Sequence, residues 1–269
     1  MPIAEVNGQR LYYEVHGEGE PLLAVMGLGG DHGAWLLQVP VWSQKHRLVV
    51  FDNRDVGQSS QAEGPYEVSD MAADALGLAD ELGLDSFHLV GLSLGGAIAQ
   101  EVALAAPERV RTLTLAVTYG ATGGYGDQRS RVLANLVRKL DREEFADLVM
   151  MLVHSERVFD HPQFVDAVRK AILENPHPQP PEAWIRQLEA SGRHDALDRL
   201  GSLTMPVHVI GARRDVMVPP FRSEDLHAAI PGSEFTLIDA GHLANVEAAE
   251  EFNGAVLDFI AACAQPDRG

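Results

Sequence analysis

The sequence predicts an α/β protein: a mostly parallel sheet of eight strands, flanked by helices, with a helical insertion after the sixth strand. Short, almost wholly apolar runs alternate with segments of helical spacing, which is typical of strands covered by helices on both faces. Such alternation implies parallel strands joined by right-handed crossovers. Near residue 119 the alternation stops, and it returns near residue 201. A length of 269 residues with 46% apolar content suits one large core with an insertion.

Local signals define the elements of the core. Asn7-Gly8 lies between two short runs and is a strong turn signal, so the first two strands should pair antiparallel at the edge of the sheet. Gly83 ends the first long helical pattern, and Pro107 ends the second. The expected strands are residues 3–6, 11–15, 22–26, 48–51, 87–90, 110–117, 207–211 and 234–238. The expected helices are residues 68–82 and 94–106 and the stretches near 222–230 and 246–262.

The insertion is expected to form a helical cap over the core. It opens with the glycine-rich residues 120–124, and its sequence shows no buried strand pattern. Prolines separate its third and fourth helical patterns. We therefore expect residues 119–200 to form the cap, and residues 1–118 and 201–269 to form one α/β core. The four cap helices are expected at residues 129–140, 142–153, 162–173 and 181–190.

Charge and cysteine content disfavour several classes of partner and site. The formal net charge of −18 repels nucleic acid and anionic membranes, so neither is expected as a partner, and it disfavours a strongly anionic substrate. The single cysteine, Cys263, can form neither an intrachain disulfide nor a cysteine-based metal cluster, and we expect no metal and no cofactor. Neither a signal peptide nor an apolar run of membrane-spanning length is visible, which favours a cytoplasmic protein. We expect a monomer or a homodimer.

The most informative motif is Gly91-Leu92-Ser93-Leu94-Gly95, which lies between a predicted strand and a predicted helix. In that setting the serine sits on a sharp turn that lifts its hydroxyl out of the sheet, and the glycines avoid collisions with neighbouring backbone. A serine between glycines can also be an ordinary loop residue. The strand before it and the helix after it favour Ser93 as a nucleophile.

A serine nucleophile needs a base, and the base needs a group that fixes its tautomer. With this elbow the partners follow in the order Ser, Asp or Glu, His, past the ends of late strands. Asp215 is the only carboxylate in the loop after residues 207–211, and His242 follows residues 234–238. Asp239 precedes His242 too closely to face its ring edge. The alternatives are a turn aspartate that caps the next helix and a surface histidine.

Acyl transfer also needs fixed N–H donors for the oxyanion of the intermediate. One donor is expected from Leu94, the residue after the nucleophile. The other is expected from Leu28, within Gly27-Leu28-Gly29-Gly30 after the third strand. This loop could instead be only a flexible turn, but a phosphate-binding loop is disfavoured because no lysine follows it.

Candidate pocket residues come from the same loop and from the insertion. His32 follows the glycine-rich loop. Met150, Met151 and Trp184 lie at helical spacing in the insertion, where ordinary packing is the alternative. Four arginines of the insertion are candidates to meet a substrate carboxylate, although solvated helix faces explain them as well. These are Arg129, Arg131, Arg138 and Arg186.

Over nearly its whole length the chain resembles the α/β-hydrolase superfamily. The motifs that carry the resemblance are Met26-Gly27-Leu28-Gly29-Gly30, Phe51-Asp52-Asn53-Arg54-Asp55-Val56-Gly57, Gly91-Leu92-Ser93-Leu94-Gly95-Gly96, Asp215 and Gly241-His242. The elbow and the tail from Asp239 to Glu247 are similar to those of 3-oxoadipate enol-lactonases and related serine carboxylesterases. The resemblance implies the α/β-hydrolase fold and a serine hydrolase that cleaves a small-molecule carboxylic ester or lactone. Ser93 would be its nucleophile, His242 its base and Asp215 the orienting acid.

Other functions stay open at the level of the sequence. The same triad could serve perhydrolysis or the hydrolysis of a C–C bond. The fold could also serve as a small-molecule receptor with slow turnover. Haloalkane dehalogenases and epoxide hydrolases are disfavoured, because their elbow carries Asp where this chain has Ser93.

Overall fold

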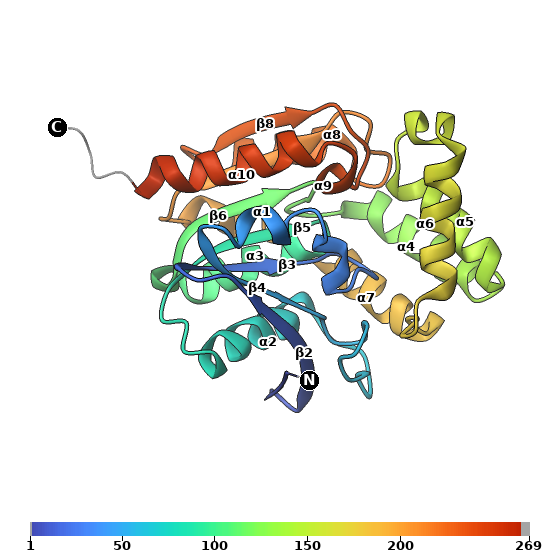
Figure 1. Cartoon of the computed structure of the whole chain (residues 1–269), viewed down its shortest axis with the longest axis horizontal. Helices are drawn as coiled ribbons and strands as arrows, with labels where there is room; N and C mark the ends of the chain where they lie inside the picture. The colour runs from blue at the N-terminus through green and yellow to red at the C-terminus, as the bar shows by residue number, and fades with distance from the viewer. Residues whose placement is uncertain (1, 265–269) are drawn as a thin grey trace.

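The computed structural model describes residues 2–264, and its centre is one sheet of eight strands (Figure 1). The strands are β1 (Ile3–Val6), β2 (Gln9–His16), β3 (Glu20–Val25), β4 (His46–Phe51), β5 (Phe87–Leu92), β6 (Val110–Ala116), β7 (Val207–Ala212) and β8 (Glu234–Ile238). They lie in the order β1-β2-β4-β3-β5-β6-β7-β8. β2 is antiparallel to both of its neighbours, and all other pairs are parallel. The predicted mostly parallel, eight-stranded sheet is confirmed.

Two apolar clusters cover the two faces of the sheet, because successive side chains of a strand point to opposite faces. In β3, Leu23 and Val25 belong to one cluster, and Leu22 and Ala24 belong to the other. The first cluster includes α2 (Val68–Glu81), α3 (Leu94–Ala105) and α8 (Pro220–Ala229), and the second includes α1 (Val39–Trp42) and α10 (Ala249–Ala264). Both faces are therefore buried, which leaves the strand ends as the place where polar side chains can collect.

Four helices lie between β6 and β7 in the chain, beyond the end of the sheet toward which β6 and β8 point (Figure 1). We call them the cap helices: α4 (Gly123–Val137), α5 (Arg142–Val153), α6 (Pro162–Glu174) and α7 (Pro181–Arg193). A capping box begins α5, since the carboxylates of Asp141 and Glu144 each accept the other residue's backbone N–H, at 2.9 and 3.0 Å. α4 begins at Gly123, earlier than the expected residue 129.

The end of the chain differs from the expectation of one helix near residues 246–262. A short helix, α9 (Ala244–Glu247), ends at Ala248, whose φ of −130° and ψ of 48° are not helical, and α10 follows. At the end of α9, the Glu247 carboxylate accepts a hydrogen bond from the Gly241 backbone N–H. Short 3-10 turns, which the sequence did not indicate, occur at η1 (His32–Trp35), η2 (Pro107–Arg109), η3 (Glu156–Asp160) and η4 (Leu197–Ser202). Within residues 2–264, no helix has the length and apolar character needed to cross a bilayer.

Candidate active site

Ser93 occupies the turn between β5 and α3. Its φ of 58° is a left-handed value, which is strained for a residue with a side chain. Two hydrogen bonds hold the turn: the Ser93 N–H donates to the Ala116 carbonyl at 2.9 Å, and the Thr118 hydroxyl donates to the Ser93 carbonyl at 2.6 Å. A Cβ at Gly95 would come within 2.0 Å of the Val25 carbonyl oxygen, so only glycine lets α3 approach β3 this closely.

Three side chains from distant parts of the sequence form one hydrogen-bonded line. His242 Nε2 lies 2.8 Å from Ser93 Oγ, and His242 Nδ1 lies 2.7 Å from Asp215 Oδ2. The other Asp215 oxygen accepts the N–H groups of Met217 and Val218, both at 2.8 Å. The exposed fractions are only 8% for Ser93, 5% for His242 and 4% for Asp215. The carboxylate favours the proton on Nδ1, which leaves Nε2 free to accept the serine proton.

Asp239, the other aspartate near His242 in the sequence, is turned away from the ring. Its carboxylate accepts hydrogen bonds from Arg157 and Arg214, each at 2.8 Å, in an exposed region. The structure therefore brings Asp215, and not Asp239, to the imidazole.

The glycine-rich loop after β3 forms a tight turn beside Ser93. A backbone hydrogen bond of 3.2 Å to the Gly27 carbonyl closes the turn, and Gly29 has the positive φ, 74°, that the third residue of a type II turn requires. A Cβ at Gly27 would lie 3.3 Å from Ser93 Oγ, so the loop backbone passes beside the hydroxyl. The next N–H in the chain belongs to Leu28. Leu94 supplies the first N–H of α3, a position that has no acceptor within the helix.

A cavity of about 810 Å³ opens at the Ser93 hydroxyl, between the sheet and the cap helices. His32, Met150 and Trp184 all line it. Met151 does not, since its side chain is 67% exposed on α5. Much of the cap side of the lining is aliphatic, so the cavity suits a largely apolar small molecule.

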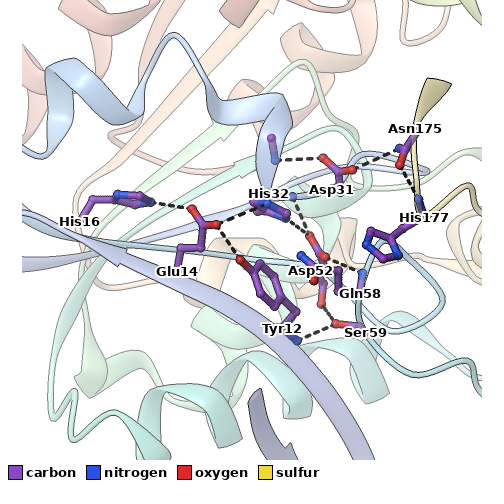
Figure 2. A network of polar contacts seen from close by, with 11 residues as sticks. Tyr12, Glu14, His16, Asp31, His32, Asp52, Gln58, Ser59, Asn175 and His177 are labelled. Carbon is purple, nitrogen blue, oxygen red and sulfur yellow. Dashed lines mark hydrogen bonds and ion pairs between the residues drawn. The ribbon is translucent and has the colours of Figure 1, made fainter. Parts of the chain in front are cut away.

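Two carboxylates fix the His32 ring (Figure 2). Asp52 Oδ1 lies 2.7 Å from both the backbone nitrogen and the ring Nδ1 of His32, and Glu14 Oε1 lies 3.5 Å from Nε2. Burial by itself raises the pKa of the Glu14 carboxyl, but hydrogen bonds from the Tyr12 hydroxyl and the His16 ring outweigh this effect and lower the pKa. His32 therefore ties the glycine-rich loop to β2 and to the end of β4.

Gln187 of α7 is a site residue that the sequence analysis missed. It is fully buried, and its Oε1 accepts the Gly29 N–H at 3.1 Å and the Gln179 amide at 3.0 Å. Its own amide donates to the Arg54 carbonyl at 3.2 Å. Gln187 thus holds the glycine-rich turn from the cap side. The available signal is a glutamine three residues after Trp184, on the apolar face of an amphipathic helix.

Glu247 is a second residue whose role was missed. One carboxylate oxygen accepts the Ser155 N–H at 2.8 Å and lies 3.1 Å from His154 Nδ1, and the other accepts the Gly241 N–H at 3.0 Å. Burial by itself raises the pKa of the Glu247 carboxyl, but these hydrogen bonds outweigh it and lower the pKa to about 2. The backbone just before His242 is thereby held against the end of α5.

The arrangement is suited to attack on a carbonyl carbon. A hydroxyl in line with an imidazole and a carboxylate can act as a nucleophile, and nearby backbone N–H groups can stabilise a developing oxyanion. Among the described residues, no group of three or more His, Cys, Asp or Glu side chains is placed to hold a metal ion.

Comparison with known proteins identifies the family of the chain. A family model described as "alpha/beta hydrolase fold" matches residues 20–249. A protein named as a candidate carbamate hydrolase, from Azorhizobium caulinodans, is 29% identical over 266 residues, which are 96% of this chain and 98% of the relative. The enol-lactonase from Burkholderia xenovorans LB400 has a TM-score of 0.89 at 26% identity, covering 97% of this chain and 100% of that one. A thermophilic esterase from Thermogutta terrifontis has a TM-score of 0.87 at 28% identity, covering 98% and 99%. The chain therefore belongs to the α/β-hydrolase family.

Proposed function

We propose that the chain is a serine hydrolase that cleaves a carboxylic ester or a lactone through an acyl-enzyme. The observation that carries the proposal is the unbroken line from Ser93 Oγ through His242 to Asp215, with separations of 2.8 and 2.7 Å, at a cavity large enough for a small molecule. Membership of the family, and the likeness to an enol-lactonase and an esterase, support it.

In the proposed reaction, His242 Nε2 takes the Ser93 proton as the hydroxyl oxygen attacks the carbonyl carbon of the substrate. The N–H groups of Leu28 and Leu94 stabilise the negative charge that develops on the carbonyl oxygen, and Asp215 stabilises the imidazolium. The imidazolium then gives its proton to the leaving alcohol oxygen, which leaves an acyl ester on Ser93. Water then attacks this ester and gives a proton to His242, which passes it to Ser93 Oγ as the acyl–oxygen bond breaks and the free acid is released.

The test compares hydrolysis of p-nitrophenyl butyrate by the unaltered chain and by Ser93→Ala. We expect kcat to fall by at least about a thousandfold in the variant. Ser69→Ala, on the exposed side of α2, is the matched control and should keep full activity. A fluorophosphonate should add one label to the unaltered chain and none to Ser93→Ala, as measured by intact mass. Equal rates for the unaltered chain and Ser93→Ala would reject the proposal.

Carbamates are the second substrate class to assay, because relatives 29% to 31% identical are named as candidate carbamate hydrolases. A carbamate offers Ser93 a carbonyl carbon of the same kind, so the same machinery would act on it. An ester and a carbamate with the same leaving group separate the two classes. If the carbamate is turned over faster, carbamates replace esters as the proposed substrate class, and the proposed roles of Ser93, His242 and Asp215 stay the same.

A further inference from the structure

The cavity at Ser93 has an apolar side and a charged side. The cap helices contribute the apolar side chains Val149, Leu152, Val153, Val168, Ile172 and Trp184. This wall can hold an aliphatic acyl group of moderate size, because burying CH₂ groups away from water is favourable. It offers no hydrogen-bonding group to a charged end of such a chain, apart from the indole nitrogen.

The charged groups of the lining, apart from histidines, are the carboxylates of Asp31 and Glu174. Asp31 accepts the Gly33 N–H at 2.9 Å and faces the Asn175 amide at 3.4 Å (Figure 2). Glu174 is exposed at the end of α6, and Lys170 approaches it only to 3.9 Å. Two carboxylates therefore stand where the loop after β3 meets the end of α6.

Carboxylates also contact two of the histidines that line the cavity, His32 and His154. The His32 ring lies between Asp52 and Glu14, and the His154 ring lies 3.1 Å from Glu247. Neither histidine therefore offers an unbalanced positive charge to an anion in the cavity.

The four arginines considered for a substrate carboxylate lie elsewhere. The Arg186 guanidinium binds Asp55 at 2.6 and 2.9 Å, and Arg138 binds Glu182 at 3.0 and 3.2 Å. Arg129 donates to the Met217 carbonyl, and Arg131 is exposed on α4. None of the four is among the residues that line the cavity at Ser93.

One further arginine lies beside an adjoining hollow of about 490 Å³ that shares Trp184 and Ile172 with the cavity. This is Arg142, whose guanidinium donates to the carbonyls of Ile172 and Asn175 at the end of α6, at 3.5 and 3.2 Å. It is therefore already bound to the negative end of that helix.

On the basis of the proposed hydrolase function, we infer that the site selects esters or lactones that carry no carboxylate. An uncharged acyl group packs against the aliphatic wall, and Asp31 and Glu174 repel an anionic one. Like charges brought together at a binding site discriminate strongly between ligands of the same size. The net charge of −18 also repels an anionic substrate as it approaches the protein.

The experiment uses two p-nitrophenyl esters of the same chain length, the neutral hexanoate and the adipate half-ester with a terminal carboxylate. We expect kcat/KM to be at least about tenfold lower for the adipate half-ester in 0.1 M salt. The difference should narrow in 1 M salt, where the screening length falls from about 10 to about 3 Å. Equal rates, or a preference for the adipate half-ester, would overturn the inference. Lack of activity on both esters would instead count against the hydrolase proposal.

Variants that neutralise one carboxylate at a time test whether Asp31 and Glu174 cause the selectivity against anionic substrates. Glu174→Gln and Asp31→Asn should each raise the adipate-to-hexanoate ratio of kcat/KM by about threefold or more. Asparagine keeps an oxygen that can accept the Gly33 N–H, so Asp31→Asn retains the turn. The control is Glu108→Gln, which makes the same charge change at an exposed position past the far end of α3. If Glu108→Gln shifts the ratio as much as the two site variants do, or if neither site variant shifts it, the inference is wrong.

Discussion

Replacing Gln187 by methionine tests whether the cap controls the glycine-rich turn. Methionine keeps the side-chain length and an apolar stem, but it removes the hydrogen bonds to the Gly29 N–H, the Arg54 carbonyl and the Gln179 amide. Gly29 follows Leu28 directly, and the proposed oxyanion donor is the Leu28 N–H. Loss of the Gln187 oxygen therefore frees the turn that aims this donor.

The magnitude follows from the groups that are left without partners. The Arg54 carbonyl belongs to a buried residue, and loss of its partner costs about 1–3 kcal/mol, whereas Gly29 is exposed and water can accept its N–H, so the free energy of unfolding should fall by about 1–3 kcal/mol. One complete oxyanion donor stabilises a transition state by about 3 kcal/mol. If displacement of the turn removes about half of this transition-state stabilisation, kcat falls about tenfold. If all of it is lost, kcat falls about a hundredfold or more.

The assay measures kcat and KM for a neutral p-nitrophenyl ester, and urea unfolding of the same samples. We expect kcat to fall while KM changes by less than about threefold, because the oxyanion exists only in the transition state. Arg186→Gln is the matched control, since it breaks the neighbouring cap contact to Asp55 without touching the turn. It should lower stability and leave kcat within about threefold. An unchanged kcat in Gln187→Met, or an equal fall of kcat in both variants, would show that Gln187 does not position the glycine-rich turn.

Three further predictions concern Asp215, Glu247 and the buried His208. Asp215→Asn should lower kcat by about 10⁴-fold with a smaller change in KM, measured on the same ester, because the wrong tautomer of His242 is then favoured. The pKa of Glu247 is lowered to about 2 from its usual 4.5, so its carboxylate stabilises the fold above about pH 4.5 and this stabilisation is lost as the pH falls toward 2. Glu247→Gln should cost up to about 3 kcal/mol near pH 7, less any solvent screening, and urea unfolding should show the difference from the unaltered chain narrowing below pH 4.5. Burial lowers the pKa of His208 to about 4, so stability should decline as the pH falls from about 6.5 toward 4, and His208→Leu should make this decline shallower in the same measurement.

The strands and the meeting of Ser93, Asp215 and His242 could be predicted because each has a local signal. Apolar runs bounded by turn residues locate strands, and every expected strand overlaps an observed one. The elbow motif locates Ser93, and the order of elements in the sheet leaves few loops in which its partners can lie.

Contacts between the cap and the core could not be predicted in the same way. Gln187 and Gly29 are 158 positions apart, and helical periodicity identifies a buried face without identifying what it faces. For the same reason the position of His32 in the cavity was predictable, but its contacts with Asp52 and Glu14 were not. The sequence around the glycine-rich loop does not indicate the direction in which the His32 ring points.

The end of α5 is bonded directly to the loop that carries His242. The Leu243 N–H donates to the Val153 carbonyl at 3.0 Å, and Glu247 bridges Ser155 and Gly241. The end of α6, in contrast, approaches the core loop after β3 through the longer Asn175 contact of 3.4 Å with Asp31. We therefore expect the cap to open at α6, with α5 as its hinge. Small molecules could then enter and leave the cavity while His242 keeps its hydrogen bonds to Ser93 and Asp215.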